Sequence, residues 1–324
     1  MRLLVTGGAG YIGSAVAAQL VTAGHDVTVV DDLSTGHADA VPSAAQFVEG
    51  SLLDDEALGR LLARGFDGVL HFAARSLVGE SVQEPALYWR NNVCGSLNLL
   101  EAIQAAGVPR LVFSSTAAVY GEPEIVPIPE TAPTAPTSPY GASKLAVDSM
   151  IGAFAARYGL AAVSLRYFNV AGAVGACGER HPVETHLIPL ALEVALGTRD
   201  QLAVYGTDYP TPDGTAIRDY IHLDDLVRAH LLAIEAAEPR RHIVCNLGNG
   251  RGYSVREVVT VARRVTGHPI PTIDEPRRPG DPAVLVASAE RAAEELGWSP
   301  ARPSLSEIVG DAWSFASSRA PSLT

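Results

Sequence analysis

The first half of the chain alternates between short apolar runs and longer stretches in which apolar residues are spaced as on a helix. The short runs cover residues 2–6, 26–30, 68–74, 110–114 and 161–166. Runs of this length are typical of strands buried on both faces of a parallel sheet. The longer stretches, which predict helices, cover residues 11–23, 91–106 and 140–158. This alternation predicts an α/β fold with one doubly wound parallel sheet.

The pattern changes beyond Asn169, where glycine and proline become frequent and the apolar runs become shorter. The change predicts a second, smaller α/β domain that is interleaved with the first. We expect residues 1–168 to form the large domain, which also receives 216–246. Residues 169–215 and 247–324 are expected to form the small domain.

A glycine-rich motif separates the first predicted strand from the first predicted helix. Gly8-x-Gly10-x-x-Gly13 is followed by Asp31, about twenty residues beyond the turn. In dinucleotide-binding turns, such glycines let the backbone approach a pyrophosphate that the helix N-terminus attracts. A purely structural role for the glycines is the alternative, and the acid and the flanking strands argue against it. We therefore predict a Rossmann-like domain.

Asp31 also indicates which dinucleotide binds. Its carboxylate can accept hydrogen bonds from the adenosine ribose hydroxyls and would repel a 2′-phosphate. Asp32 beside it supplies no compensating arginine. The cofactor is therefore expected to be NAD rather than NADP.

A second candidate site lies at the end of the strand at 110–114. The hydroxyl residues Ser114-Ser115-Thr116 fall there, at the edge where open α/β sheets bind ligands. Capping of the strand end is the alternative role. We interpret His71, a single histidine in an apolar strand, as a packed core residue. Residues 121–139 hold six prolines, which predicts a long loop over the site.

Tyr140 and Lys144 lie one helical turn apart on the same face of the third predicted helix, for which Pro139 is a suitable first residue. A tyrosine normally ionises near pH 10, but a neighbouring cation favours the phenolate. The pair could therefore transfer protons at neutral pH. By itself this spacing also occurs by chance on many surface helices.

Three arginines in the second half could bind an anion. Arg218 and the pair Arg277-Arg278 are the candidates, because guanidinium groups bind phosphate oxygens through two hydrogen bonds. The alternative is an ordinary surface ion pair, for example between Arg218 and Asp219.

Composition narrows the function further. The 24 basic and 36 acidic residues give a net charge of −12, which argues against nucleic acid and anionic membranes as partners. The three cysteines are far apart and lack metal-ligand spacing, so we expect free thiols and no metal. The N-terminal run is too short for a signal peptide and no apolar run could span a bilayer. These features predict a cytoplasmic protein.

Several segments together resemble the extended short-chain dehydrogenase/reductase superfamily and, within it, the UDP-glucose (UDP-galactose) 4-epimerases. The resemblance runs nearly end to end. The segments that carry it cover residues 7–14, 78–81, 91–93, 114–121, 140–144, 166–169, 186–189, 208–222 and 277–281. It implies interconversion of UDP-glucose and UDP-galactose in galactose metabolism, through transient oxidation of carbon 4 of the hexose by NAD.

The resemblance also implies a role for individual residues. Tyr140 would take the proton of the 4-hydroxyl, Lys144 would hold the nicotinamide ribose and lower the pKa of the tyrosine, and Thr116 would hydrogen-bond the same hydroxyl. The residues implied to bind NAD are Gly7, Gly10, Tyr11, Ile12, Gly13, Asp31, Asp32, Leu33, Ser51, Leu52, Phe72, Ala73, Ala74, Asn91, Ser114, Tyr140, Lys144 and Tyr167. Those implied to bind the UDP-hexose are Thr116, Tyr140, Asn169, His186, Leu187, Ala203, Tyr205, Arg218, Arg278 and Asp281.

Three positions depart from the pattern of similar enzymes. Thr116 replaces a serine and keeps the hydroxyl, whereas Ser51 replaces an aspartate that contacts the adenine amino group. Leu285 stands where some relatives have a bulky tyrosine. The smaller residue could admit UDP-N-acetylhexosamines or UDP-pentoses, which remain alternative substrates.

Other functions of the same fold are less well supported. Dehydratases need an acid and a base after the hydroxyl residue, where this chain has Ala117-Ala118, and methyl groups cannot transfer protons. Decarboxylases tend to carry a glutamate there. A non-catalytic NAD-binding protein would usually lack the tyrosine or the lysine. The resemblance also implies a homodimer, joined through the helices at 93–106 and 144–157.

Overall fold

The computed structural model describes residues 1–278 and 280–319. Its larger half is a seven-stranded sheet in which every pairing is parallel, with the order β10-β6-β5-β4-β1-β2-β3. The strands are β1 (Arg2–Thr6), β2 (Asp26–Asp31), β3 (Gln46–Glu49), β4 (Gly68–His71), β5 (Arg110–Thr116), β6 (Ala161–Tyr167) and β10 (His242–Leu247). The predicted doubly wound parallel sheet is therefore confirmed. Edge strand β3, which is only half-buried, was not predicted.

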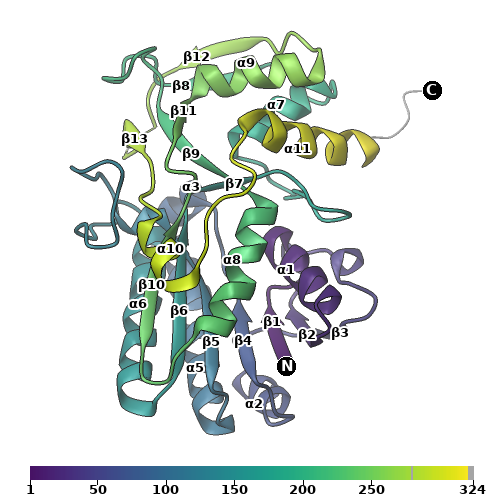
Figure 1. Ribbon diagram of the computed structural model, residues 1–324. Helices are drawn as coiled ribbons and strands as arrows, with labels where there is room; N and C mark the ends of the chain where they lie inside the picture. The colour runs from purple at the N-terminus through teal and green to yellow at the C-terminus, as the bar shows by residue number, and fades with distance from the viewer. Residues whose placement is uncertain (279, 320–324) are drawn as a thin grey trace.

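Helices cover both faces of this sheet (Figure 1). One face carries α1 (Tyr11–Thr22) and α8 (Leu223–Ala236). The other carries α2 (Asp55–Leu62), α5 (Gly95–Ala106) and α6 (Pro139–Tyr158). Because the strands are buried between two helical layers, their apolar runs are nearly continuous, as the sequence indicated.

Shorter elements connect these layers. They are η1 (Ala38–Ala40), α3 (Val78–Gln83), α4 (Pro85–Tyr88), the π-helix η2 (Trp89–Cys94), η3 (Ala117–Val119) and α10 (Glu290–Leu296). Among the described residues, every helix is too short or too polar to cross a lipid bilayer.

A smaller second layer lies beyond the carboxyl ends of the large sheet (upper part of Figure 1). Strand β9 (Ile217–His222) pairs with β7 (Asn169–Ala171), β11 (Gly252–Ser254) and β13 (Val284–Leu285), while β8 (Leu202–Tyr205) pairs with β12 (Thr272–Glu275). Helices α7 (Leu187–Ala195), α9 (Val255–Thr266) and α11 (Leu305–Arg319) share one apolar core with these strands.

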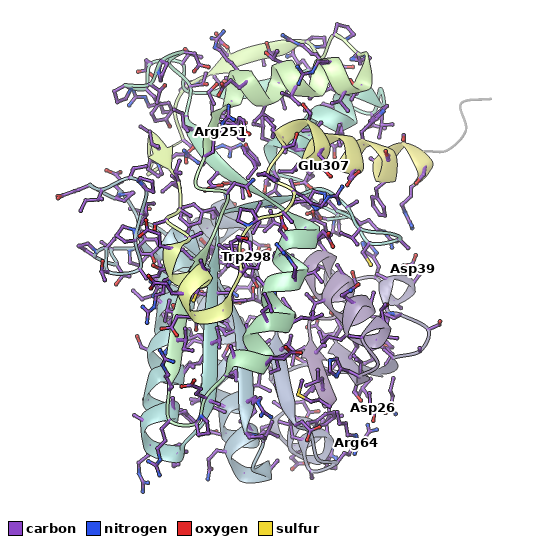
Figure 2. The ribbon with its side chains drawn as sticks, viewed as in Figure 1. Asp26, Asp39, Arg64, Arg251, Trp298 and Glu307 are labelled. Carbon is purple, nitrogen blue, oxygen red and sulfur yellow. The ribbon has the colours of Figure 1, made fainter. Side chains whose placement is uncertain are left out.

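The chain crosses between the two halves more often than the predicted boundaries allow. Within 216–246, α8 and β10 lie with the large sheet, but β9 lies in the small one. Helix α10 packs against α8 and β10, although its residues were placed in the small domain. Trp298, just beyond α10, is fully buried there and donates its indole N–H to the carbonyl of Asp225 (2.8 Å; Figure 2). The division into domains stays a prediction.

The predicted helix at 91–106 differs from the structure at its start. Residues 89–94 form the π-helix η2, and only then does α5 begin. A π turn holds more residues than an α turn, so the stretch is not one regular α-helix from Asn91. Within α5, Leu97 is 36% exposed, whereas Leu99, Leu100 and Ile103 are buried.

Candidate active site

A cavity of about 420 Å³ opens at the carboxyl edge of the large sheet, where the small layer faces it. Its walls come from the glycine-rich turn, the ends of β2, β4, β5 and β6, the start of α6, and segments of the small layer. This is the edge at which parallel α/β sheets bind ligands. The predicted 121–139 loop is present, but its residues do not line this cavity.

The glycine-rich turn fits a dinucleotide for two separate reasons. Gly7 has a φ of +69°, and a Cβ on Gly13 would lie 2.2 Å from the Gly7 carbonyl oxygen, so both glycines are needed to form the turn. Gly10 has an ordinary φ of −83°, and a Cβ there would meet only one atom, at 3.4 Å. Because neither conformation nor packing requires glycine at position 10, its bare backbone suits a group that approaches from the cavity, such as a pyrophosphate.

The Asp31 carboxylate is fixed beside this turn. It accepts hydrogen bonds from the backbone N–H groups of Ala9 (3.0 Å) and Leu33 (2.9 Å). Burial raises the pKa of Asp31 above its usual value. Leu33 adopts a positive φ of 57° and, contrary to expectation, does not line the cavity.

The end of β5 presents hydroxyl groups in two directions. Ser114, Ser115 and Thr116 all line the cavity, and the Ser115 hydroxyl donates to Asp148 on α6 (3.1 Å). The Thr116 oxygen accepts the N–H of Ala118 (3.1 Å), which is the capping role considered as an alternative. The same side chain acts to lower the pKa of Tyr140, and its role toward the substrate stays a prediction.

Tyr140 and Lys144 lie on the first turns of α6, as predicted. Ser138 caps this helix by accepting the N–H of Gly141 (3.2 Å), and Pro139 is its first residue. Lys144 donates to the Ser114 carbonyl (2.7 Å) and lies 4.8 Å from the centre of the Phe113 ring.

The electrostatics of this pair differ from the expectation. Burial lowers the pKa of Lys144 to about 7, with Asp148 opposing the shift. Burial also raises the pKa of Tyr140, and the Thr116 hydrogen bond offsets this only in part. Desolvation of the phenolate therefore dominates in the ligand-free protein, and the lowering of the Tyr140 pKa by Lys144 stays a prediction.

A buried histidine orients Tyr167 on the other wall. His230 on α8 has Nδ1 at 2.9 Å from the Leu226 carbonyl, so this nitrogen carries the proton. Its Nε2 then accepts the Tyr167 hydroxyl (2.8 Å). Burial lowers the pKa of His230 to about 4, which keeps it neutral. His71, in contrast, bonds Thr6 and Ser96 in the core, and its predicted structural role is confirmed.

The far end of the cavity holds part of the predicted substrate set. Asn169, His186, Arg218 and Leu285 line it. Arg218 pairs with Asp281 and not with Asp219, whose carboxylate accepts the backbone N–H groups of three residues of the small layer, Asn249, Gly250 and Ala287. The pair of Arg218 with Asp219, considered as the alternative to an anion site, is therefore not formed, and Arg218 is paired with Asp281 instead.

The remaining predicted substrate residues lie outside the cavity lining. Arg278 stacks on the Tyr205 ring, 4.1 Å from its centre, and Arg277 pairs with Asp208 (2.7 Å). Leu187 begins α7 behind His186. The predicted residues that do not line the cavity are Leu33, Leu187, Ala203, Tyr205, Arg278 and Asp281.

The cavity also has walls that the sequence did not indicate. A turn of small residues after Asp32 lies beside Asp31, and two segments of the small layer reach in from the other side. The lining residues missed in this way include Ser34, Thr35, Gly36, Ser76, Val78, Phe168, Val170, Glu179 and His181. The run Ser34-Thr35-Gly36 after the acidic pair was the available signal for the first of these walls.

Comparison with known proteins agrees with this site. The model of the NAD dependent epimerase/dehydratase family matches residues 3–248. A UDP-glucose 4-epimerase of Corynebacterium glutamicum is 58% identical over 319 residues, covering 98% of this chain and 96% of the relative. Another, from Streptomyces lividans, is 61% identical over 320 residues, covering 98% and 96%.

Solved structures give the same result. The crystal structure of UDP-glucose 4-epimerase from Brucella ovis in complex with NAD matches with a TM-score of 0.92 and 46% identity, covering 97% of this chain and 98% of that one. The UDP-Glc/GlcNAc 4-epimerase of Campylobacter jejuni matches with a TM-score of 0.84 and 40% identity, covering 98% and 99%. The chain therefore belongs to the NAD dependent epimerase/dehydratase family and, within it, to the UDP-glucose 4-epimerases.

Proposed function

We propose that this protein interconverts UDP-glucose and UDP-galactose by oxidising and then re-reducing carbon 4 of the hexose. One observation carries the proposal. Tyr140, Lys144 and Thr116 line a single cavity whose walls also hold the dinucleotide turn and Arg218. The candidate base thus shares one cavity with the places where a cofactor and an anionic substrate would be held.

The cofactor is NAD. The bare backbone at Gly10 and the Asp31 carboxylate would hold its pyrophosphate and adenosine ribose, and Ser51 and Leu52 would lie along its adenine. When bound, NAD supplies the acceptor, and later the donor, of the hydride at carbon 4. Lys144 and Tyr167 would contact its nicotinamide end.

Tyr140 is the residue that removes and returns the proton of the 4-hydroxyl, with Thr116 hydrogen-bonded to the same oxygen. Burial keeps the phenol protonated in the ligand-free protein, so the base must form as the cavity fills. Lys144 is the cation of the chain that can favour the phenolate, since it lies one turn away on α6.

The substrate end has to hold the nucleotide while the hexose turns between the two steps. Arg218, with its partner Asp281, would bind the diphosphate and a uridine ribose hydroxyl. Arg278 and Tyr205 would complete the uridine site from outside the cavity wall. Asn169 and His186, which line the cavity, would also contact the UDP-sugar, Asn169 near its diphosphate.

The other reactions considered for this fold lack a proton carrier at the required place. Ala117 and Ala118 line the cavity directly after Thr116, where a dehydratase needs an acid and a base. Methyl groups cannot serve that purpose. This supports a reaction confined to carbon 4.

A wider substrate range is the second candidate function, and Leu285 favours it. This side chain lines the cavity at the substrate end, where a smaller residue leaves room for an N-acetyl group. Turnover of UDP-N-acetylglucosamine at a rate comparable to that of UDP-glucose, which Leu285→Tyr reduces selectively, would support the candidate. No detectable turnover of UDP-N-acetylglucosamine would remove it.

The direct test is to incubate the purified protein with UDP-galactose and follow the formation of UDP-glucose. We expect conversion without net accumulation of NADH. Tyr140→Phe should lower kcat by about 10³-fold because the proton carrier is lost. Tyr158→Phe, at the exposed end of the same helix, is the matched control and should retain activity. Full activity of Tyr140→Phe would contradict the assignment.

We also propose a homodimer that acts in the cytoplasm. Leu97 on α5 is an exposed apolar residue beside α6, which supports the seam of helices 93–106 and 144–157. The three cysteines are free thiols, as is usual in a reducing compartment. A solution mass equal to one chain would contradict the dimer.

A further inference from the structure

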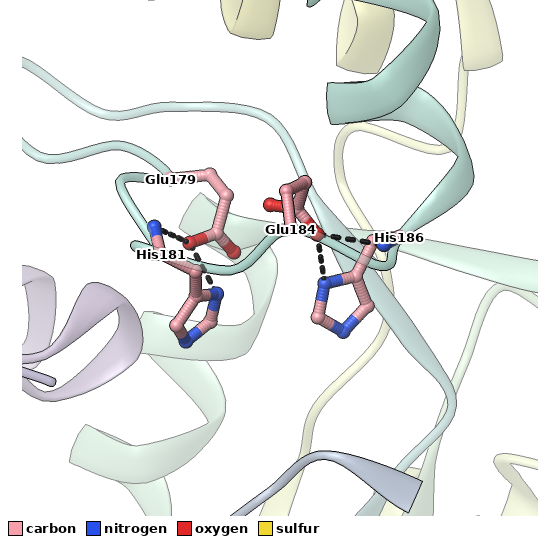
Figure 3. Close-up of side chains that lie close together, drawn as sticks. All are labelled: Glu179, His181, Glu184 and His186. Carbon is pink, nitrogen blue, oxygen red and sulfur yellow. Dashed lines mark hydrogen bonds and ion pairs between the residues drawn. The ribbon is translucent and has the colours of Figure 1, made fainter. Parts of the chain in front are cut away.

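We propose that Glu179, His181, Glu184 and His186 bind one divalent transition-metal ion, with zinc as the favoured ion. These side chains come from one loop before α7 and face one another (Figure 3). One possible ligand atom from each lies within 4.8 Å of the others. Two imidazoles and two carboxylates form a ligand set that suits zinc.

The ligand atoms are close to the spacing that an ion requires. Two donors bound about 2.1 Å from one tetrahedral zinc ion lie about 3.4 Å apart, so the widest pair needs to close by up to about 1.4 Å. Both glutamates use only Oε1 for their hydrogen bonds in the described residues. The second oxygen of each carboxylate carries no bond in Figure 3 and is free to coordinate.

The charges of the cluster also favour the binding of a cation. Its nearest arginine, Arg180, pairs with Asp39 (3.0 Å) and is not directed at the two glutamates. The histidine nitrogens face the carboxylates at 2.6 Å for His181 and 2.7 Å for His186. With neutral imidazoles the cluster carries two negative charges, and an ion of charge +2 would balance them.

An ion could reach this position from two sides. Glu179 and His181 line the main cavity and also a second cavity of about 160 Å³, which α7 and α11 border. Tyr11, on the first turn of α1, lines both cavities as well. A bound ion would therefore fix the loop to the start of α7, beside the cofactor turn.

The role of the ion rests on the proposed function, although its binding does not. The main cavity has to accept two diphosphate groups, and the Glu179 carboxylate in its wall would repel them. A resident cation would remove that repulsion. Metal removal should then raise the KM for UDP-galactose more than it lowers kcat.

The test is a titration of chelator-treated, tag-free protein with Zn²⁺ by calorimetry. We expect one saturable site per chain. His181→Ala and the conservative Glu179→Gln should each weaken it by about 100-fold, and Zn²⁺ should raise the Tm of the unaltered protein but not of these variants. Circular dichroism establishes that each variant is folded.

The control is His25→Ala. His25 lies 3.2 Å from the N-terminal amine, and this pair is the alternative place for adventitious zinc. His25→Ala should leave the titration unchanged. The proposal is overturned if no saturable site is found, or if binding is lost in His25→Ala and kept in His181→Ala. Because zinc binding is measured without substrate, its failure is distinguishable from failure of the epimerase assignment.

Discussion

At the scale of single residues, Lys144 shows how burial changes the pKa values that a sequence motif leads one to expect. The spacing of Tyr140 and Lys144 placed an ammonium beside a phenol, and the structure keeps them on one helix face. Burial, however, opposes charge on both groups and lowers the pKa of Lys144 to about 7. In the ligand-free protein Tyr140 is therefore uncharged at neutral pH, and Lys144 loses its charge near pH 7.

This lowered pKa predicts a specific dependence of stability on pH. The unfolded chain holds the Lys144 proton up to about pH 10.4, whereas the folded chain loses it near pH 7. Between these values the unfolded state binds more protons, so the free energy of unfolding rises with pH by up to about 1.4 kcal/mol per unit from this group. Denaturant unfolding at pH 7 to 9.5 should show a shallower rise for Lys144→Met. Equal slopes for the two proteins would contradict the shifted pKa.

Thr116 gives a second prediction at this scale. Its hydroxyl caps η3 and also acts to lower the pKa of Tyr140. Thr116→Ser keeps the hydroxyl and should retain most of kcat, while Thr116→Val should lower kcat by about 10-fold or more. Steady-state rates with UDP-galactose measure both variants. Equal rates for the serine and valine variants would show that the hydroxyl has no part in the reaction.

Site residues that the local backbone conformation requires were predictable from the sequence. Residues that come together only through the folding of a loop were not. Gly13 is required by a contact within the turn itself, and Asp31 follows at a set distance. The cluster of Glu179, His181, Glu184 and His186 depends on how one loop folds back. Its sequence signal, Glu-x-His occurring twice within eight residues, was present but went unrecognised.

At the scale of elements, α6 is held in place by a buried ion pair. Asp148, one turn beyond Lys144, accepts hydrogen bonds from Arg166 on β6 (3.0 Å) and from Ser115 on β5 (3.1 Å). Arg166 in turn donates to Tyr120 (2.9 Å). Each partner is adjacent in sequence to a residue of the cavity wall, so this network sets the distance of α6 from β5 and β6.

Asp148→Asn should disturb both stability and catalysis. Removing one charge leaves the Arg166 guanidinium buried without its counter-ion, which we expect to cost about 3 kcal/mol. Displacement of α6 should lower kcat by about 10-fold. Since Asp148 raises the pKa of Lys144, the alkaline limb of the kcat profile should also move to lower pH, which a purely structural defect would not produce.

The control for this variant is Ser149→Ala, the next residue on the same helix. Its hydroxyl is exposed and bonds only the Leu145 carbonyl. We expect changes within about 0.5 kcal/mol and an unaltered pH profile. If the Asp148→Asn protein had the same stability and the same pH profile as this control, the network would not position α6.

Strands β1, β2, β4, β5 and β6 and helices α1, α5 and α6 were predictable, because each carries its own apolar pattern, whereas β10, α2 and α8 were not predicted. The π-helix η2 was not predictable, since a wider turn leaves no clear mark on apolar spacing. β3 was missed because an edge strand buries only one side of its pattern.

At the scale of the whole molecule, the site exists because the chain passes between the two layers several times. β9 and β13 bring Arg218 and Leu285 to a cavity whose other walls come from the first 186 residues. Pairings between segments so distant in sequence cannot be predicted from local patterns. The resemblance to known epimerases identified these residues, and the structure shows which of them share a cavity.

The central claim is that carbon 4 gives up a hydride and receives the same one back. The measurement that tests it most directly uses UDP-galactose labelled with deuterium at carbon 4, followed by NMR of the product. The account predicts UDP-glucose that retains the deuterium at carbon 4, because the label never leaves the closed site. Loss of the label to water would show that carbon 4 exchanges a proton instead, and would contradict the account.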